Sequence, residues 1–467
     1  MTSNRIRYRL HFMLALWLYM QMLSACVSSD SEDGRWFTQL PSSYETYLDS
    51  KLQKIRALED EEGSHSFIFV TDTHLSANSL LSPKMIHYLC THARAKDVVW
   101  GGDAIPAYTK ENSPDACREA ILSYWNKHQT FFSDSLGKVA RVYPVRGNHE
   151  LTIKMQSKSS EKERKGNGYT FSQEDVKSFL CGQLGSHVSV SPFATGCYYF
   201  FDDEASLMRY LILDGTANPV ISGSYAWGND QGMGISDEEF QWVKQHALKT
   251  LPEGYALMVF NHEGLTMNTY PHQSMERWFG KMRKELEALA NGTEDYAERG
   301  KTDIVVCSGH KHQDLQCFMN GILHVGTACD AYYQDYRHSP FFNDVPRREK
   351  DGATGCLFDY VISNFSQHQL HCIRIGAGFD RHFNLEKVCL KMGESTKLSS
   401  RMLSPNRWRS CDSAGNSYSY STKQWTLSNQ VVNVMNGKVK AVKKGESIVF
   451  AEDAEGNKEF WYLVVTQ

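Results

Sequence analysis

The sequence lacks the features of a nucleic-acid-binding protein or a repeat protein. Its 50 Lys and Arg residues are outnumbered by 54 Asp and Glu, so the net charge is -4. The composition therefore provides no excess of positive charge for binding a nucleic-acid backbone. Charges of both signs are mixed without a long block of one sign, which is typical of a solvated surface. The 467 residues contain no long repeat or low-complexity tract. This length suits one large domain plus a small one, or two or three ordinary domains.

None of the 12 cysteines stands in a Cys-x-x-Cys pair, which argues against a cysteine zinc site. Setting Cys26 aside leaves eleven, an odd number, so at least one stays unpaired even in an oxidising compartment. We expect most of them to be small buried hydrophobic residues. Two local disulfides are plausible, Cys181 with Cys197 and Cys389 with Cys411.

The N-terminal residues have the pattern of an export signal. Three arginines precede an apolar run from about Leu10 to Leu23, which is too short for a comfortable final membrane anchor. The stretch LSAC at 23–26 resembles a bacterial lipobox, which implies removal of residues 1–25 and lipidation of the Cys26 thiol. Residues 26–62 would then form a tether and N-terminal segment of a protein anchored in the cell envelope, on the periplasmic side or the outer-membrane surface. An ordinary signal peptide and a short signal anchor are the alternatives.

The middle of the chain repeats one pattern, a short and almost unbroken apolar run followed by a polar loop. Runs of this length and composition fit strands that are buried on both faces. They are residues 66–70, 97–100, 142–145, 255–260 and 303–308, and the loops after them read TDTH, GGDA, RGNHE, NHEG and GHKH. Helical segments are expected at 82–96, at 236–250 after a capping box of Ser236 and Glu239, and at 274–292. The alternation predicts an α/β fold whose polar loops lie at the carboxyl ends of the strands.

The polar residues in these loops are of metal-ligating types. Carboxylate, imidazole and amide groups bind divalent metals such as Zn, Mn and Fe. The residues are Asp72, His74, Asp103, Asn148, His149, His262, His310 and His312. A lone histidine is more often a satisfied polar residue, but five in polar turns after buried strands predict a shared site.

Taken in order, these motifs resemble those of the calcineurin-like metallophosphoesterases, over roughly residues 64–380. The motifs are Asp72-x-His74, Gly102-Asp103, Gly147-Asn148-His149-Glu150, Asn261-His262 and Gly309-His310-x-His312. The resemblance implies a four-layer αββα sandwich over residues 63–385 that holds two divalent metal ions, Mn, Zn or Fe. It also implies hydrolysis of a small phosphate ester by direct attack of a metal-bound hydroxide, without a phosphoenzyme.

The resemblance also implies a role for each residue. One ion would be held by Asp72, His74, Asp103 and His312, and the other by Asp103, Asn148, His262 and His310. Asp103 therefore bridges the two ions. His149 would contact the substrate and, if protonated, could stabilise the transition state or protonate the leaving group.

Arg146 also stands where the protein-phosphatase branch of the family has a phosphate-gripping arginine. That branch has a longer second motif ending in Asp-Arg-Gly, whereas this chain reads GGDAIPAY, so its substrate is not carried over. Pro106 stands where purple acid phosphatases have a tyrosine ligand, and Tyr108 is favoured as a pocket wall.

The remaining polar residues near the motifs carry weaker signals. Asp214 is favoured as a turn residue, and structural roles are favoured for His324 and Asp330. Glu150 either makes a hydrogen bond behind the ligands or caps a turn, or it is simply exposed; the sequence leaves these alternatives open.

The C-terminal residues 388–467 have a different pattern of apolar and polar residues. Apolar and polar residues alternate between turns at Asn436-Gly437, Lys444-Gly445 and Glu455-Gly456, which predicts a small all-β sandwich. The segment resembles the bacterial immunoglobulin-like domain of group 2, which implies a spacer or adhesive module.

Three functions follow from these patterns. The first is a dinuclear metal-dependent phosphoesterase. The second is a phosphodiesterase or nucleotidase specialised for nucleotides or phospholipid head groups, and the third is a catalytically inert surface-binding protein. The complete ligand set argues against the third.

Overall fold

The computed structural model describes residues 40–75, 81–106, 108–109, 113–130, 136–150, 152–155, 168–216, 234–266, 275–331, 348–349, 352–412, 417–419, 424–426 and 431–467. The predicted export signal and Cys26 lie outside these residues. Within them, no helix has both the length and the apolar character needed to cross a membrane.

Two large sheets form the centre of the molecule. One has nine strands in the order β18-β23-β24-β16-β15-β14-β1-β2-β4, and the other has seven in the order β12-β13-β11-β10-β9-β8-β7. Six parallel strands lead to the predicted site: β1 (His65–Val70), β2 (Asp97–Trp100), β4 (Arg141–Pro144), β9 (Met208–Ile212), β10 (Ala256–Phe260) and β11 (Ile304–Ser308). The five strands predicted from apolar runs are therefore confirmed.

The other strands extend or flank the two sheets. In the seven-stranded sheet they are β7 (Ser189–Val190), β8 (Tyr199–Asp203), β12 (Leu315–Met319) and β13 (Ile322–Gly326). In the nine-stranded sheet they are β14 (Leu357–Asn364), β15 (Gln369–Gly376), β16 (Arg381–Lys391), β18 (Arg407–Asp412), β23 (Gly445–Glu452) and β24 (Lys458–Thr466). Two small sheets consist of β3 (Tyr108–Thr109), β5 (Thr152–Met155) and β6 (Gly168–Thr170), and of β19 (Ser417–Ser419) and β20 (Gln424–Thr426).

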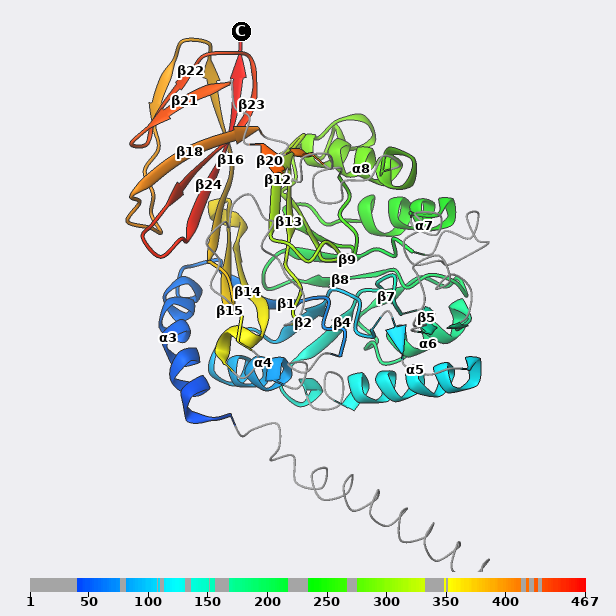
Figure 1. Cartoon of the computed structure of the whole chain (residues 1–467). Coiled ribbons are helices and arrows are strands. Elements are labelled where there is room, and N and C mark those ends of the chain that lie inside the picture. The colour runs from blue at the N-terminus through cyan, green and yellow to red at the C-terminus, as the bar shows by residue number, and fades with distance from the viewer. Residues whose placement is uncertain are drawn as a thin grey trace, which may run out of the picture.

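Helices cover the outer faces of both sheets (Figure 1). They are α3 (Ser42–Glu59), α4 (Leu81–His92), α5 (Pro114–His128), α6 (Gln173–Cys181), α7 (Asp237–Trp242) and α8 (Met275–Asn291). Along β10, Met258 and Phe260 pack between the sheets, whereas Leu257 and Val259 pack with the core under α7 and α8. The layers therefore run helices, nine-stranded sheet, seven-stranded sheet, helices.

The predicted start of α7 is confirmed in part. Ser236 Oγ accepts the backbone N–H of Glu239 at 3.0 Å, as a helix cap should. The Glu239 carboxylate does not complete a capping box, because it accepts the N–H of Asp214 at 2.8 Å. This hydrogen bond joins the first turn of α7 to the loop that follows β9.

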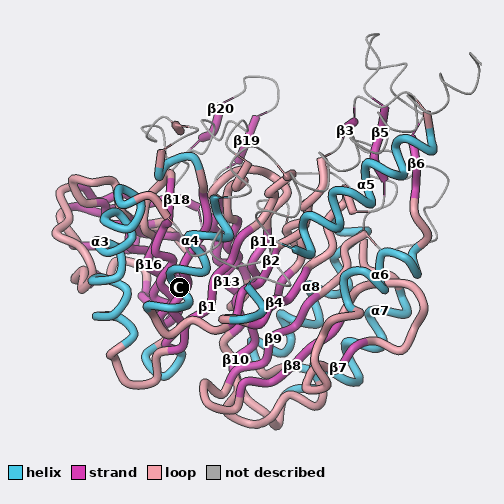
Figure 2. Tube along the Cα trace, turned by 90° about the horizontal axis from the view of Figure 1, so that it is seen from below, coloured by secondary structure: helices cyan, strands magenta, loops and turns pink. Residues whose placement is uncertain are grey.

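Part of the N-terminal segment belongs to the folded core. Helix α3 lies beside α4 (Figure 2) and contacts β14 and β15. It buries Leu48, Leu52 and Ile55. Lys54 Nζ lies 2.7 Å from Asp380 Oδ2, on the loop between β15 and β16. Helix α3 is thus held by both apolar packing and an ion pair.

The C-terminal region is rich in β-strands, as predicted. A three-stranded sheet of β17 (Ser395–Lys397), β22 (Lys438–Ala441) and β21 (Val432–Met435) shares a core with β23 and β24. The expected turn is present, because Asn436 and Gly437 have φ of 49° and 78° between β21 and β22. The second layer of this region is the end of the nine-stranded sheet, so the proposed boundary between 385 and 388 falls inside β16. Its immunoglobulin-like identity stays a prediction.

The two expected disulfides are absent, because the eleven cysteines from Cys90 to Cys411 are all free. Cys389 on β16 and Cys411 on β18 are separated by β24 and β23. Three strand spacings of about 4.8 Å far exceed the roughly 7 Å limit between bridged Cα atoms, so that prediction was wrong. Cys181 and Cys197 are neighbours whose thiols hydrogen-bond in the reduced state.

Candidate metal centre

The loops after five strands bring the predicted ligands together. They follow β1, β2, β4, β10 and β11, whose carboxyl ends point to the same edge of the packed sheets. They carry Asp72 and His74, Asp103, Asn148 and His149, His262, and His310 and His312, respectively. Residues far apart in sequence thus form one cluster.

The backbone at this cluster is unusual. Five of the predicted ligands have left-handed backbone angles, with φ of 54° at Asp72, 44° at His74, 54° at Asp103, 65° at His310 and 55° at His312. Each such conformation costs a non-glycine residue about 1–3 kcal/mol and persists only where the surroundings impose it. These backbone conformations lower the stability of the fold, and they set the directions in which the ligand side chains point.

Two motif glycines allow the loops to approach closely. A Cβ atom added at Gly309 would lie 2.1 Å from Thr71 Oγ1 and 2.4 Å from Asp72 Oδ2. A Cβ atom at Gly147 would lie 2.2 Å from Asp103 Oδ1. Both glycines are thus required because a carboxylate of the cluster occupies the space of a side chain.

The first group of ligand atoms comprises Asp72, His74 and His312. Asp72 Oδ1 lies 3.2 Å from His312 Nε2 and 3.8 Å from His74 Nε2. The two Nε2 atoms are 3.2 Å apart. His74 Nδ1 lies 3.3 Å from the carbonyl oxygen of Ile105, which can only accept, so this nitrogen carries the proton and Nε2 presents its lone pair.

The second group comprises Asp103, Asn148, His262 and His310. His262 Nδ1 donates to the carbonyl of Gly101 at 2.7 Å, which turns its Nε2 lone pair inward. That Nε2 lies 3.2 Å from Asp103 Oδ2, 3.3 Å from His310 Nδ1 and 3.9 Å from Asp72 Oδ1. Asn148 Oδ1 is 2.8 Å from His310 Nδ1. His262 therefore lies between the two carboxylates and joins the two groups.

The donor set fits divalent cations. Asp72 Oδ1 is fully buried, and three imidazole Nε2 atoms lie within 3.9 Å of it, the nearest that of His312 at 3.2 Å. Such a polar atom is costly to bury unless a cation satisfies it.

The electrostatics of the two carboxylates support the same conclusion. Burial alone would raise the pKa of Asp72, but His262 and His312 hold it below its usual range. Asp103 is likewise held well below its usual pKa, against burial, by His149 and His262. Burial would lower the pKa of His262, and the two carboxylates raise it well above its usual value. The pocket thus favours positive charge at its centre.

Glu150 holds two of the ligand loops together. Its buried carboxylate accepts backbone N–H groups from Asp103 at 3.0 Å, Ala104 at 2.7 Å and Gly147 at 2.6 Å. Burial and the nearby Asp103 raise the pKa of Glu150 to about 7. Of the alternatives that the sequence left open, the structure selects the hydrogen-bonding role behind the ligands.

His149 is closer to the ligands than a substrate-contact role alone suggests. Its backbone N–H donates to Asp103 Oδ1 at 2.9 Å, and its Nε2 lies 3.3 Å from Asp103 Oδ2. Burial lowers its pKa to about 3, although Asp103 opposes this. Burial therefore favours the neutral imidazole, whereas the acid role that the resemblance implies holds only if His149 is protonated. Its catalytic and substrate-binding roles stay predictions.

Arg146 is paired with a buried carboxylate. Its side chain is fully buried, and Nη1 lies 3.2 Å from Asp214 Oδ2 and also donates to Gln173. Asp214 accepts the N–H of Cys197 at 2.7 Å, so the pair joins the loops after β4 and β9. The phosphate contact of Arg146 stays a prediction.

The polar residues with weaker sequence signals make contacts within the fold. Asp330 accepts Ser82 Oγ at 2.8 Å and the N–H of Leu357 at 2.9 Å, and His324 is buried on β13. Asp214 is a turn residue that accepts the N–H of Thr216 at 3.0 Å. The side chain of Tyr108 lies outside the described part of the chain.

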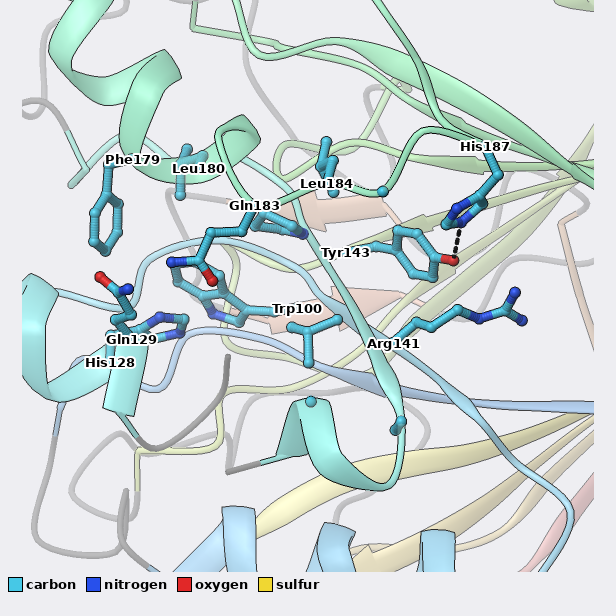
Figure 3. A pocket seen from close by; sticks show the side chains of 15 residues that line it. Trp100, His128, Gln129, Arg141, Tyr143, Phe179, Leu180, Gln183, Leu184 and His187 are labelled. Atoms are coloured by element: carbon cyan, nitrogen blue, oxygen red, sulfur yellow. Dashed lines mark hydrogen bonds between the residues drawn. The ribbon is translucent and has the colours of Figure 1, made fainter. Parts of the chain in front are cut away.

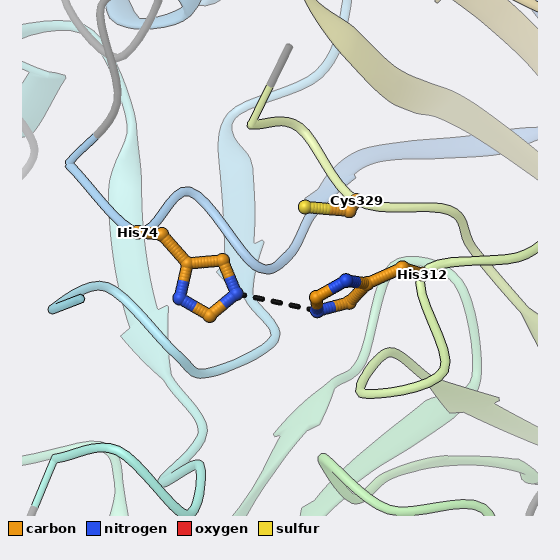
Figure 4. A group of neighbouring side chains, drawn as sticks. All are labelled: His74, His312 and Cys329. Carbon is orange, nitrogen blue, oxygen red and sulfur yellow. Dashed lines mark hydrogen bonds between the residues drawn. The ribbon is translucent and has the colours of Figure 1, made fainter. Parts of the chain in front are cut away.

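The sequence reasoning missed Cys329. Its sulfur belongs to a group with His74 and His312 in which the ligand atoms all lie within 4.8 Å of one another (Figure 4). The available signal was its position, because GTACD follows a strand that runs parallel to β11 and ends at the same edge.

A buried ion network also supports the GHKH loop. Arg374 on β15 contacts Asp314 Oδ1 at 2.6 Å and Asp359 Oδ1 at 2.9 Å. Asp314 follows His312 by two residues and also accepts the N–H of Ala328 at 3.1 Å. Arg374 therefore links the loops that carry His312 and Cys329 to the nine-stranded sheet.

A separate cavity of about 250 Å³ lies along the outer edge of β4 (Figure 3). Its walls include Trp100, His128, Tyr143 and Phe179, and the amides of Gln129 and Gln183 border it. None of the predicted metal ligands lines this cavity.

A comparison with family models assigns the chain. The model described as "Calcineurin-like phosphoesterase" matches residues 65–314, which is more than half of the sequence. The chain therefore belongs to this family and is a hydrolase that acts on phosphate ester bonds, with His and Asp groups positioned to bind divalent metals. No curated protein matches the sequence.

Solved structures include distant likenesses. A dimetal phosphatase from Danio rerio is 13% identical, and the match covers 68% of this chain and 98% of that chain with a TM-score of 0.44. A putative 5'-nucleotidase from Staphylococcus aureus is 13% identical over 67% of this chain and 54% of that chain, with a TM-score of 0.33. Neither likeness is close enough to define a substrate.

Proposed function

We propose that this chain is a dinuclear metal-dependent phosphoesterase, exported and held in the cell envelope by a lipid on Cys26. The observation that carries the enzymatic part is the surroundings of Asp72 Oδ1. This fully buried oxygen has three imidazole nitrogens within 3.9 Å, the nearest that of His312 at 3.2 Å, so carboxylate and imidazole groups from three loops meet at one point.

The seven predicted ligands divide into two overlapping sets. One consists of Asp72, His74, Asp103 and His312, and the other of Asp103, Asn148, His262 and His310. Two divalent cations held there would supply a water activated for attack near neutral pH and positive charge for the phosphate oxygens.

The chain's own groups prepare the site for this chemistry. The carbonyls of Ile105 and Gly101 fix which nitrogens of His74 and His262 carry a proton, so that both Nε2 atoms face the centre. Asn148 contributes a neutral oxygen and adds no negative charge beside a phosphate. His149, kept neutral by burial, can donate one hydrogen bond to a phosphate oxygen.

The ends of the chain suggest how the enzyme is displayed. The lipobox-like LSAC at 23–26 precedes helix α3, which begins at Ser42 and packs on the catalytic domain. A lipid on Cys26 would therefore hold the hydrolase close to the membrane. The C-terminal β-rich region, proposed to be immunoglobulin-like, would act as a spacer or adhesive module.

A substrate and metal panel tests the enzymatic proposal. The purified protein is stripped of metal, given Mn, Zn or Fe separately, and assayed on phosphomonoesters and phosphodiesters. We expect hydrolysis to return with at least one metal, and the ratio of monoester to diester rates defines the substrate class. Undiminished hydrolysis by the stripped protein, with no metal regained, would overturn the proposal.

A further inference from the structure

Cys329 lies beside the first group of ligands, on the loop after β13. Its sulfur, His74 and His312 form a group whose ligand atoms are all within 4.8 Å of one another. Figure 4 shows the three side chains coming from separate loops toward a common space. Among the residues that the structure describes, no other cysteine belongs to such a group.

The main chain around Cys329 is fixed to the ligand loop. The N–H of Asp330 donates to the carbonyl of Thr71 at 3.0 Å, and the N–H of Ala331 donates to the carbonyl of Asp72 at 3.2 Å. On the other side, Arg348 donates to the carbonyl of Cys329 at 2.8 Å. The position of the sulfur is therefore set by the same backbone that sets Asp72.

The thiol itself is buried and directed inward. Cys329 Sγ donates to the carbonyl oxygen of Asp72 at 3.0 Å, and the residue is 1% exposed. A serine would keep this hydrogen bond, so a structural role needs only a small donor. Sulfur differs from oxygen in its affinity for softer metals, and that difference can be tested.

We propose that Cys329 belongs to the metal centre and biases the ion near His74 and His312 toward thiophilic metals such as zinc or cobalt and against manganese. The inference rests on the proposed dinuclear function. On coordination a sulfur–metal bond forms, the S–H bond breaks, and the proton passes to solvent. The thiol gives up its hydrogen bond to Asp72 in the same step.

Cobalt spectroscopy tests this directly. The metal-free full chain is titrated with Co²⁺ and followed in the visible and near-ultraviolet, because a thiolate ligand adds a charge-transfer band that nitrogen and oxygen ligands lack. We expect the band in the wild type, its loss in Cys329→Ser, and its retention in Cys389→Ser, which removes the exposed thiol. A competition between Zn²⁺ and Mn²⁺ should shift toward manganese in Cys329→Ser, by about tenfold to a hundredfold.

The outcomes separate the two proposals. If the wild type binds Co²⁺ without the band, or Cys329→Ser keeps both the band and the zinc preference, Cys329 is not a ligand and the dinuclear centre stands. If the wild type binds no Co²⁺, Zn²⁺ or Mn²⁺, the proposed centre itself fails. If Cys329→Ser does not fold, the spectra of the wild type and of Cys389→Ser still test the proposal. Absence of the charge-transfer band from either protein would refute Cys329 as a ligand.

Discussion

Single side chains behind the ligands determine the geometry of this site. Glu150 is the clearest case, because one carboxylate accepts three backbone N–H groups from two loops, one of which carries Asp103. One of these N–H groups belongs to Asp103, so the position of Asp103 depends on Glu150. The histidine tautomers depend in the same way on single carbonyl oxygens of Gly101 and Ile105.

Replacing Glu150 by Gln should weaken metal binding. The amide NH₂ would face backbone N–H donors that the carboxylate now satisfies, so the Asp103 loop should shift. We expect metal affinity to fall by about tenfold to a hundredfold, measured by competition with a chelator. Glu62→Gln, on the exposed turn after α3, is the control. Equal affinity in both variants would show that Glu150 does not organise the site.

Replacing His149 by Ala should separate binding from rate. Because seven other side chains supply the proposed ligands, metal content should stay unchanged. The variant loses one hydrogen-bond donor to the phosphate, so kcat/KM should fall by about a hundredfold to a thousandfold. His246→Ala, at an exposed position beyond α7, should leave both unchanged. A His149→Ala protein that loses metal would instead make His149 a ligand.

The sequence predicted which residues the structure brings together, since each stands in a polar turn at the end of a strand, and their roles as metal ligands stay predictions. It could not predict the partners of side chains that meet only in three dimensions. Arg146 pairs with Asp214, 68 positions away, and Cys329 meets His74 across two loops. Burial likewise lowers the pKa of His149, and no local pattern contains that information.

At the scale of elements, helix α3 is joined to the catalytic domain through Asp380. Burial alone would raise the pKa of this carboxyl, but Lys51 and Lys54 lower it from 3.8 to about 2. Because the folded pKa is below the unfolded one, the carboxylate stabilises the fold above pH 3.8, and this contribution is lost as pH falls through about 2.

Asp380→Asn should therefore destabilise the protein in a pH-dependent way. At pH 7 we expect a loss of about 2 kcal/mol in the free energy of unfolding, and near pH 2 the variant and the wild type should converge. Asp60→Asn, which removes an exposed ion pair with Arg94, should cost at most about 1 kcal/mol. Denaturant unfolding of the full chain at several pH values measures the free energy of unfolding of the wild type, Asp380→Asn and Asp60→Asn. A pH-independent loss would argue against the ion pair.

Over the whole molecule, the nine-stranded sheet connects the catalytic region with the C-terminal β-strands. β16 pairs antiparallel with β15 and parallel with β24, and Phe318 of the seven-stranded sheet stacks on Tyr462 with ring centroids 5.2 Å apart. The sequence showed the strands and the turn at Asn436-Gly437. It could not show that β16 and β24 complete one sheet, because this pairing joins residues far apart in the chain.

Deleting residues 386–467 should therefore not leave an intact phosphoesterase. The truncation cuts β16 and removes β24, so it exposes the edge of the remaining part of β16 and the rings of Phe318 and Phe383. We expect aggregation or loss of cooperative unfolding, monitored by circular dichroism and light scattering. A soluble truncated protein with full activity would show that the C-terminal region is independent.

The most direct test of the central claim is the metal content of the wild type and of Asp103→Asn, measured by mass spectrometry beside the hydrolysis rate. Two divalent ions per chain in the wild type, with loss of bound metal and of hydrolysis in Asp103→Asn, is the result that a shared aspartate predicts. Full hydrolysis by Asp103→Asn, or an active wild type that retains no metal, would contradict it.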